Sequence, residues 1–152
     1  MPATIVRAGD RAPINILGMP LTMLCEASET GGSWSLFEEL VPPGMGPPAH
    51  RHDWDEAYYI LDGEIDFQID GEPVRSRRGD FNYLPRGTVH GFKGASPGEA
   101  RVLIFAAPAH GSEFFEELNN EVRSLPDDLA KIPEIGERHG IYFVPSGDEV
   151  NR

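Results

Sequence analysis

The sequence predicts an all-β domain, a sandwich or barrel of short strands, followed by a short helical segment. Seventeen glycines and 14 prolines make up about a fifth of the 152 residues; that share is too high for a helical bundle and lacks the period of collagen. Between about residues 20 and 107, β-prone runs alternate with turn signals at short spacing. After residue 110 the apolar residues change to helical spacing.

Runs in which apolar and polar residues alternate predict the strands. They lie at residues 21–25, 34–41, 58–61, 65–69, 72–77, 81–84, 89–93 and 101–106. Asp62-Gly63 and Asp70-Gly71 predict hairpin turns, and residues 28–32 predict a further turn. Residues 41–48 (VPPGMGPP) predict a shaped loop, because closely spaced prolines fit neither a helix nor a central strand.

The last third of the chain predicts a lid of helices. Helical spacing is shown by Phe114, Phe115, Leu118, Val122 and Leu125. We expect this helix to be capped at its N-terminus by Ser112 and stopped by Pro126, with a second short helix at 127–132. Residues 141–144 predict a last strand. We expect segment 112–132 to pack on one sheet, where Phe114 or Phe115 narrows a pocket entrance.

Length and charge limit the classes of function. One domain over residues 1–152 is expected at this size. The net charge of −12 at pH 7 argues against nucleic-acid and membrane partners, and we interpret Arg75, Arg77 and Arg78 as solvated residues near a strand end. The single cysteine, Cys25, forms no intrachain disulfide, and no apolar run is long enough to span a membrane, so a cytoplasmic location is expected.

Three of the five histidines and one glutamate form a candidate metal site. His50 and His52 are two residues apart, so on an extended segment both rings project from one face. Glu56 has the same parity, and His90 comes from a separate strand. Imidazoles with a carboxylate are a ligand set that transition metals favour. Unrelated surface histidines are the alternative, because His-x-His alone is a weak signal. The other two histidines, His110 and His139, are expected at the surface.

Glycine and proline positions around these residues resemble the two motifs of the cupin family. The first motif, in residues 44–63, is matched by Gly44, His50, His52, Glu56 and Gly63. The second, in residues 79–94, is matched by Gly79, Pro85, Gly87 and His90. Gly94 stands where the family often has asparagine, which puts in doubt only the turn after the second motif.

The resemblance implies a cupin jelly-roll β-barrel (a double-stranded β-helix) with a C-terminal helical segment at about 112–132. It also implies one divalent transition metal per chain, held by His50, His52, Glu56 and His90. Family members use iron, manganese, nickel, cobalt, copper or zinc, and the ligand set does not choose among them. Pairing through outer strands is common in the family, so a homodimer is expected.

Strand parity predicts the lining of the pocket. Tyr58 and Ile60 share the face of Glu56, and Phe92 shares that of His90. The full set of candidate substrate-binding residues is Tyr58, Ile60, Phe67, Tyr83 and Phe92. Ordinary core packing is the alternative for each. Tyr58 has a further candidate role in catalysis, because its phenol lies two residues from the metal carboxylate and is able to hydrogen-bond substrate or pass a proton.

Residues 50–66 and the helix SEFFEEL (112–118) resemble small quercetin-dioxygenase-like cupins. The activity implied is cleavage of a flavonol-like or other enol or aromatic small molecule with O₂, with Glu56 as general base. Two alternatives stay open. One is a redox-neutral metal-dependent isomerase, decarboxylase or lyase, and the other is a non-catalytic metal- or ligand-binding protein. No glycine-rich nucleotide fingerprint is present, so no nucleotide cofactor is expected.

Overall fold

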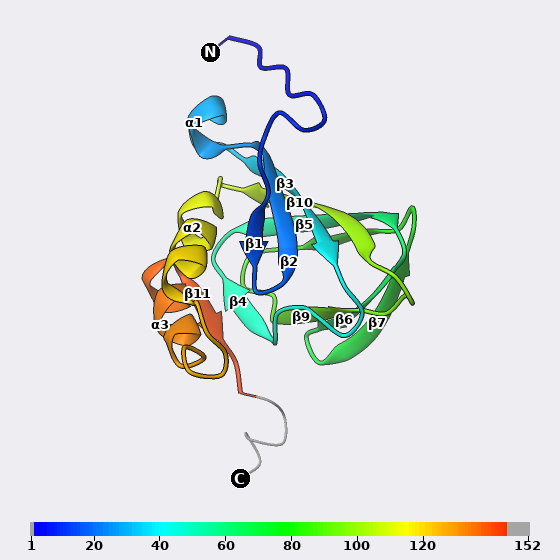
Figure 1. Cartoon of the computed structure of the whole chain (residues 1–152). Coiled ribbons are helices and arrows are strands. Elements are labelled where there is room, and N and C mark those ends of the chain that lie inside the picture. The colour runs from blue at the N-terminus through cyan, green and yellow to red at the C-terminus, as the bar shows by residue number, and fades with distance from the viewer. Residues whose placement is uncertain (1, 146–152) are drawn as a thin grey trace.

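The computed structural model describes residues 2–145, which form two antiparallel sheets facing each other (Figure 1). The six-stranded sheet runs in the order β1 (Ile14–Ile16), β2 (Met19–Cys25), β3 (Ser35–Val41), β10 (Ala100–Ala107), β5 (Asp55–Asp62) and β8 (Phe81–Leu84). The five-stranded sheet runs β11 (Ile141–Phe143), β4 (His50–His52), β9 (His90–Gly94), β6 (Glu64–Ile69) and β7 (Glu72–Arg77). The chain crosses between sheets from β3 to β4, β5 to β6, β7 to β8 and β9 to β10, and this confirms the expected jelly-roll fold.

Alternation along each strand builds the core between the two sheets. In β3 every second residue is buried, and in β6 Ile65 and Phe67 are fully buried. They meet Ile60 of β5 and Val102 of β10, which are also buried. The hairpin at Asp62-Gly63 turns tightly because Gly63 has φ +77°, and a side chain there would come within 2.9 Å of the Ala100 Cα. These contacts keep the inner faces in register.

The proline-rich loop at 42–48 packs against β9. Backbone N–H groups of Phe92 and Gly94 donate to the carbonyls of Pro47 and Met45, at 3.2 and 2.9 Å. Gly94 is required here because a Cβ at this position would lie 2.3 Å from the Pro42 carbonyl oxygen. The asparagine often found at this place in cupins would not fit beside this loop. The loop therefore runs along β9 and delivers the chain to His50, the first residue of β4.

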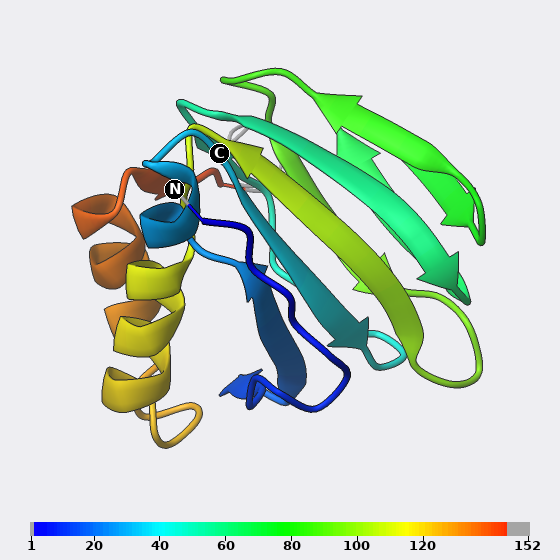
Figure 2. The same ribbon diagram turned by 90° about the horizontal axis from the view of Figure 1, so that it is seen from above.

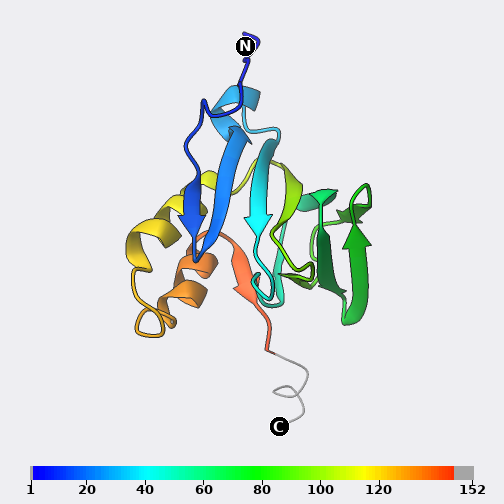
Figure 3. The same cartoon turned by 45° about the vertical axis from the view of Figure 1, so that its right-hand side comes forward.

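Two helices cover the opening between the sheets at the edges formed by β1 and β11. They are α2 (Ser112–Glu121) and α3 (Lys131–Arg138), which lie beside the β1–β2 hairpin (Figures 2 and 3). α2 contacts β1 and α3, and α3 contacts β11. α2 directs the buried side chains of Phe114 and Leu118 inward. The expected lid is present, and it bridges the edges of both sheets.

Several element boundaries differ from the sequence expectation. The turn expected at 28–32 contains a short helix, α1 (Ala27–Thr30), which ends at Gly31 with φ +63°. Helix α2 begins after Gly111 rather than being capped by Ser112, and it ends at Glu121, before Pro126. Its end follows from Asp128, whose carboxylate accepts the backbone N–H groups of two residues beyond the helix at 2.9 and 3.0 Å. The second helix is α3, which starts later than expected. Strand β1 was not predicted.

Two observations concern the nucleic-acid and membrane partners that the sequence argued against. Arg75 pairs with Asp66 at 2.7 Å, and Arg77 lies 3.3 Å from Glu64, so acidic neighbours offset these two arginines. Among residues 2–145, every helix is too short or too polar to cross a membrane.

Candidate functional site

Three histidines converge at one end of the space between the sheets. His50 and His52 point inward from β4, as their spacing predicts, and His50 pairs in register with His90 of β9. All three are buried, with exposed fractions of 8%, 5% and 1%. One ligand atom from each lies within 4.8 Å of the others. Ligands about 2.1 Å from one ion lie about 3–4 Å apart, so small side-chain adjustments would bring all three onto a metal.

Backbone carbonyls fix which nitrogen of each ring faces the site. Nδ1–H of His50, His52 and His90 donates to the carbonyls of Pro48, Trp54 and Thr88, at 2.8, 3.2 and 2.9 Å. Nε2 of each ring is therefore the nitrogen available to a metal. Nε2 of His52 and of His90 is buried and faces the Glu56 carboxylate. Such orientation from outside the ligand set is typical of metal-binding histidines.

Glu56 completes the cluster from the opposite sheet. Its Oε2 lies 3.1 Å from Nε2 of His52, and its Oε1 lies 3.5 Å from Nε2 of His90. Burial acts to raise the pKa of Glu56, but hydrogen bonding and charge from His52 and His90 outweigh burial and bring it well below its ordinary value. Imidazole lone pairs and an anionic carboxylate converging on one buried point need a cation between them. The residues therefore fit a divalent transition metal.

The pKa values of two imidazoles in the cluster are shifted in opposite directions. Burial, reinforced by nearby His90, lowers the pKa of His50 to about 4, so this ring is neutral at physiological pH. Burial also acts to lower the pKa of His90, but the hydrogen bond and charge of Glu56 prevail and raise it. A metal binds only the neutral form of an imidazole, so metal binding and protonation compete for His90.

Tyr58 is coupled directly to the carboxylate. It lies two residues after Glu56 on β5, and its hydroxyl donates a hydrogen bond to Glu56 Oε1. Burial and the charge of Glu56 raise the pKa of Tyr58 well above its ordinary value, so the phenol keeps its proton. Tyr58 therefore holds one carboxylate oxygen in place.

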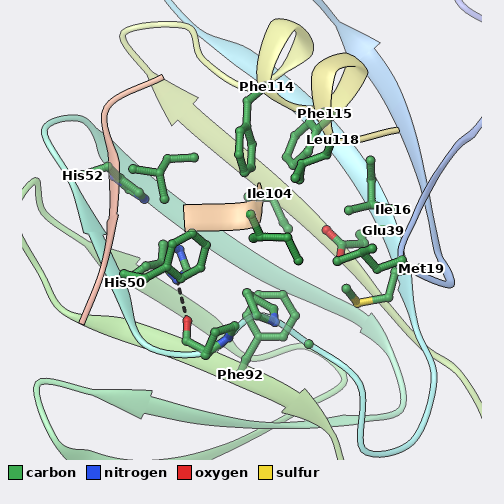
Figure 4. A pocket seen from close by; sticks show the side chains of 18 of the residues that line it. Ile16, Met19, Glu39, His50, His52, Phe92, Ile104, Phe114, Phe115 and Leu118 are labelled. Carbon is green, nitrogen blue, oxygen red and sulfur yellow. Dashed lines mark hydrogen bonds between the residues drawn. The ribbon is translucent and has the colours of Figure 1, made fainter. Parts of the chain in front are cut away.

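A cavity of about 520 Å³ opens beside the cluster. It is lined by His50, His52 and Glu56 together with apolar side chains from both sheets and from the lid (Figure 4). Phe114 and Phe115 both line it. Its size suits a small organic molecule.

The structure separates the five residues expected to bind substrate. Tyr58 and Phe92 line the cavity. Ile60 and Phe67 are fully buried in the core outside the cavity lining, where the Phe67 ring packs edge-on against Tyr58. The expectation for Tyr83 is wrong: its side chain is 58% exposed on the outer face of β8 and lies outside the cavity. Tyr83 pairs with Ala57, which also faces away from the inner row of Glu56 and Tyr58.

Sequence reasoning missed three residues of the site. His110 is a wall of the cavity, half-buried and stacked on Trp54 with ring centroids 3.6 Å apart, so its expected surface position is wrong. The other expected surface histidine, His139, is also half-buried, beside Glu117. Trp54 stacks on His52 at 3.9 Å, and its spacing from His52 was a usable signal. Glu39 lines the cavity from β3, and its parity with Phe37 and Val41 indicated that it faces inward.

Comparisons with known proteins place this geometry among relatives. A family model described as "Cupin domain" matches residues 37–106. The chain is similar to the uncharacterized protein MJ1618 of Methanocaldococcus jannaschii, with 32% identity over 89 residues that cover 58% of this chain and 71% of that protein. It is also similar to the tetracenomycin polyketide synthase protein TcmJ of Streptomyces glaucescens, with 24% identity over 127 residues, 82% of this chain and 84% of that protein.

A shorter similarity links the chain to quercetin 2,3-dioxygenase of Bacillus subtilis, with 29% identity over 65 residues. It covers 42% of this chain and only 19% of that enzyme. Among solved structures, the polyketide cyclase RemF from Streptomyces resistomycificus superposes with a TM-score of 0.61 at 24% identity, over 71% of this chain and 80% of that one. This likeness shows a shared fold.

Proposed function

The chain belongs to the cupin family, and from this premise we propose that it is a metal-dependent enzyme, a dioxygenase acting on an enolic or aromatic small molecule. The observation that carries the proposal is the convergence of three imidazoles and the Glu56 carboxylate in a buried cluster beside an apolar cavity. Burying three imidazoles and a carboxylate at one point is costly for stability, whereas a divalent metal ion would be bound by all four.

His50, His52, His90 and Glu56 would hold one divalent transition metal. Such an ion would supply Lewis acidity toward an enol oxygen and, if redox-active, electron transfer toward dioxygen. The surrounding apolar wall excludes water from the reacting groups, which strengthens electrostatic interactions within the cavity. The lid helices complete that wall.

Glu56 and Tyr58 divide the proton chemistry between them. Tyr58 occupies Glu56 Oε1 through its hydrogen bond, and Glu56 Oε2 is the oxygen that takes the enol proton of the substrate. Because the phenol keeps its own proton, Tyr58 acts by orienting Glu56 rather than as the base. The hydrogen bond from Tyr58 therefore holds Glu56 Oε2 in one orientation.

The lining favours a flat, apolar substrate. Phe92, Phe114 and Ile104 form much of the wall around the metal cluster. Two relatives, named as a polyketide synthase protein and a quercetin dioxygenase, support a substrate of the polyketide or flavonol type. A redox-neutral reaction on such an enol is the second candidate, favoured by the Tyr58–Glu56 pair, since proton transfer alone is enough for an isomerisation or cyclisation.

We also propose that the chain forms a homodimer through the outer face of the six-stranded sheet. This face carries a row of exposed aromatic side chains, Trp34, Tyr59, Phe81, Tyr83 and Phe105. Two pairs stand out within it: Tyr59 pairs in register with Phe81, and Trp34 stacks on Phe105 with ring centroids 5.8 Å apart. A contiguous exposed apolar patch of this kind marks an interaction surface.

The test is oxygen uptake by protein loaded separately with iron, manganese, cobalt, nickel or copper. The substrates offered are flavonols, catechols and 1,3-diketones. Uptake that needs both substrate and metal supports the dioxygenase. Metal-dependent product formation without uptake supports the redox-neutral enzyme instead. Metal binding without any product from the panel supports a non-catalytic binding role.

Variants assign the residues in the same assay. Glu56→Gln should lower turnover more than metal content, and Tyr58→Phe should lower turnover while keeping the metal. Tyr59→Phe is the matched control, because Tyr59 is the next residue of β5 and points outward, 44% exposed. Unchanged turnover in Glu56→Gln would reject its role as base.

A further inference from the structure

Glu39 is a second buried carboxyl group in the same cavity, remote from the metal cluster. It lies on β3 between Phe37 and Val41 on the inner face, and only 6% of it is exposed. Figure 4 shows its carboxyl group beside Ile16 and Met19, on the opposite side of the cavity from His50 and His52. A carboxyl group in apolar surroundings is costly to bury without a partner.

Among residues 2–145, no side chain or backbone group hydrogen-bonds or forms an ion pair with the Glu39 carboxyl. Glu56, by contrast, is held by Tyr58 and lies against two histidines. Burial and the charge of Glu56 raise the pKa of Glu39 to about 8. At neutral pH Glu39 is therefore a carboxylic acid, with one O–H donor and one carbonyl acceptor aimed into the cavity.

The register of the six-stranded sheet sets the distance between Glu39 and Glu56. Glu56 pairs with Ala106, which pairs with Ser35, and Glu39 lies four residues further along β3. Two strand spacings of about 4.8 Å and four rises of about 3.3 Å put the Glu39 and Glu56 Cα atoms roughly 16 Å apart. Glu39 and Glu56 therefore lie at different positions along the cavity, and a molecule that contacts both is elongated in that direction.

We propose that Glu39 is a substrate-binding residue that hydrogen-bonds a hydroxyl or carbonyl group at the end of the substrate remote from the metal. The inference rests on the proposed function and extends it: the substrate is an elongated, uncharged polycyclic phenol or ketone. Its one end carries the enol that reacts, and its other end carries an oxygen that satisfies Glu39. A site built to hydrogen-bond such an oxygen rejects analogues that lack it.

An ammonium group is a poorer match for this end of the cavity. It carries three donors and needs several acceptors when buried. The side chains around Glu39, which include Ile16, Met19 and Leu118, offer none. A neutral oxygen needs only the one donor and one acceptor that a carboxylic acid presents.

The test compares two probes, 3-hydroxyflavone and 3,4′-dihydroxyflavone, in zinc-loaded protein, where no redox turnover occurs. Both carry the same chelating end, and only the second has a distal hydroxyl. Binding is followed by the absorbance shift of the flavone. Wild type should bind the dihydroxy probe about tenfold more tightly, the effect of one net hydrogen bond.

Glu39→Leu should abolish this preference while binding 3-hydroxyflavone at least as tightly as wild type. Glu39→Gln keeps a donor and an acceptor, so it should retain the preference. Glu38→Gln is the matched control, since Glu38 faces outward and pairs with Arg101. A preference that persists in Glu39→Leu, or is absent from wild type, overturns the proposal, as does failure of both probes to bind.

Measuring the metal content distinguishes failure of the Glu39 proposal from failure of the proposed function. If the protein binds no zinc, the metal-dependent enzyme is rejected, and the same probes are compared in metal-free protein. The hydroxyl preference then still reports Glu39, because it is a ratio between two probes with the same chelating end. Loss of the preference only in Glu39→Leu would uphold the role of Glu39 even in that case.

Discussion

The indole of Trp54 lies flat against the imidazole of His52, with ring centroids 3.9 Å apart and planes 4° from parallel. His110 stacks on the other face of the indole at 3.6 Å and 14°. Its Nε2–H donates to the His139 carbonyl at 2.7 Å, and the side chain of His139 pairs with Glu117 of α2. The lid is therefore connected through two stacked rings to a candidate metal ligand.

This stack should set metal affinity without contributing a ligand. We expect Trp54→Leu to weaken zinc binding about 10- to 100-fold, as loss of partners outside the ligand set commonly does, because His52 then keeps its backbone hydrogen bond but loses the stacked ring that restricts its motion. Trp54→Phe keeps an aromatic face and should bind within a few-fold of wild type. Competition with a chromophoric chelator measures the affinity, and near-wild-type circular dichroism confirms folding. Equal affinity in Trp54→Leu and wild type would contradict the role.

Removing one ligand should abolish metal binding and leave the fold intact. His90→Ala removes one candidate ligand, and the metal-free protein loses a backbone hydrogen bond, the contact with Glu56 and some packing. Elemental analysis after dialysis should give stoichiometric metal for wild type and little for His90→Ala. His139→Ala is the control, because this histidine lies outside the cluster. Stoichiometric metal in His90→Ala would show that the ligand set is wrong.

How much of the site could be predicted depended on how local each contact is. His50, His52 and Glu56 are close in sequence, and strand parity alone puts them on inner faces. The stack of His110 on Trp54 joins residues far apart in the chain, and neither has a local pattern that reveals it. Glu39 was missed because an isolated glutamate in a strand is ordinarily solvent-facing, although its alternation with Phe37 indicated otherwise.

The boundaries of helices and strands could likewise be predicted only where local contacts determine them. Hairpins with glycine turns were located closely, since the turn residues themselves require the bend. The predicted lid helices differ by several residues from the observed ones. The first helix ends early because the carboxylate of Asp128 accepts backbone N–H groups just beyond it, a contact that periodicity does not show. The prediction that Tyr83 lines the pocket did not take the pairing of β5 with β8 into account. In that register Tyr83 is paired with Ala57, and both face outward.

The outer aromatic row should decide the oligomeric state. Tyr83→Glu places a charge in the middle of the proposed interface, and a buried unpaired carboxylate is strongly unfavourable. We expect light scattering to give a dimer mass for wild type and a monomer mass for this variant. Tyr142→Glu is the control, as Tyr142 is 42% exposed on the other sheet and lies beside Arg51. A monomeric wild type would reject the interface outright.

Glu39 should make the stability of the metal-free protein fall as pH rises. Its ordinary pKa is 4.5, and burial together with the charge of Glu56 raises the pKa to about 8 in the folded chain. Between these values the folded chain keeps a proton that the unfolded chain has released. The free energy of unfolding contributed by this group therefore decreases as pH increases through that interval.

Glu39→Gln removes the titrating proton and keeps the shape of the side chain, so it lacks this decrease. The advantage of the variant over wild type should grow from pH 4.5 to pH 8 by on the order of 4 kcal/mol. Urea unfolding of both proteins across this range measures the difference, in which titration of all other groups largely cancels. Glu38→Gln should track wild type, because Glu38 is half-exposed and pairs with Arg101. A difference that stays constant with pH would mean that Glu39 is ionised in the folded protein, and its carboxylate would then have to be stabilised by water in the cavity.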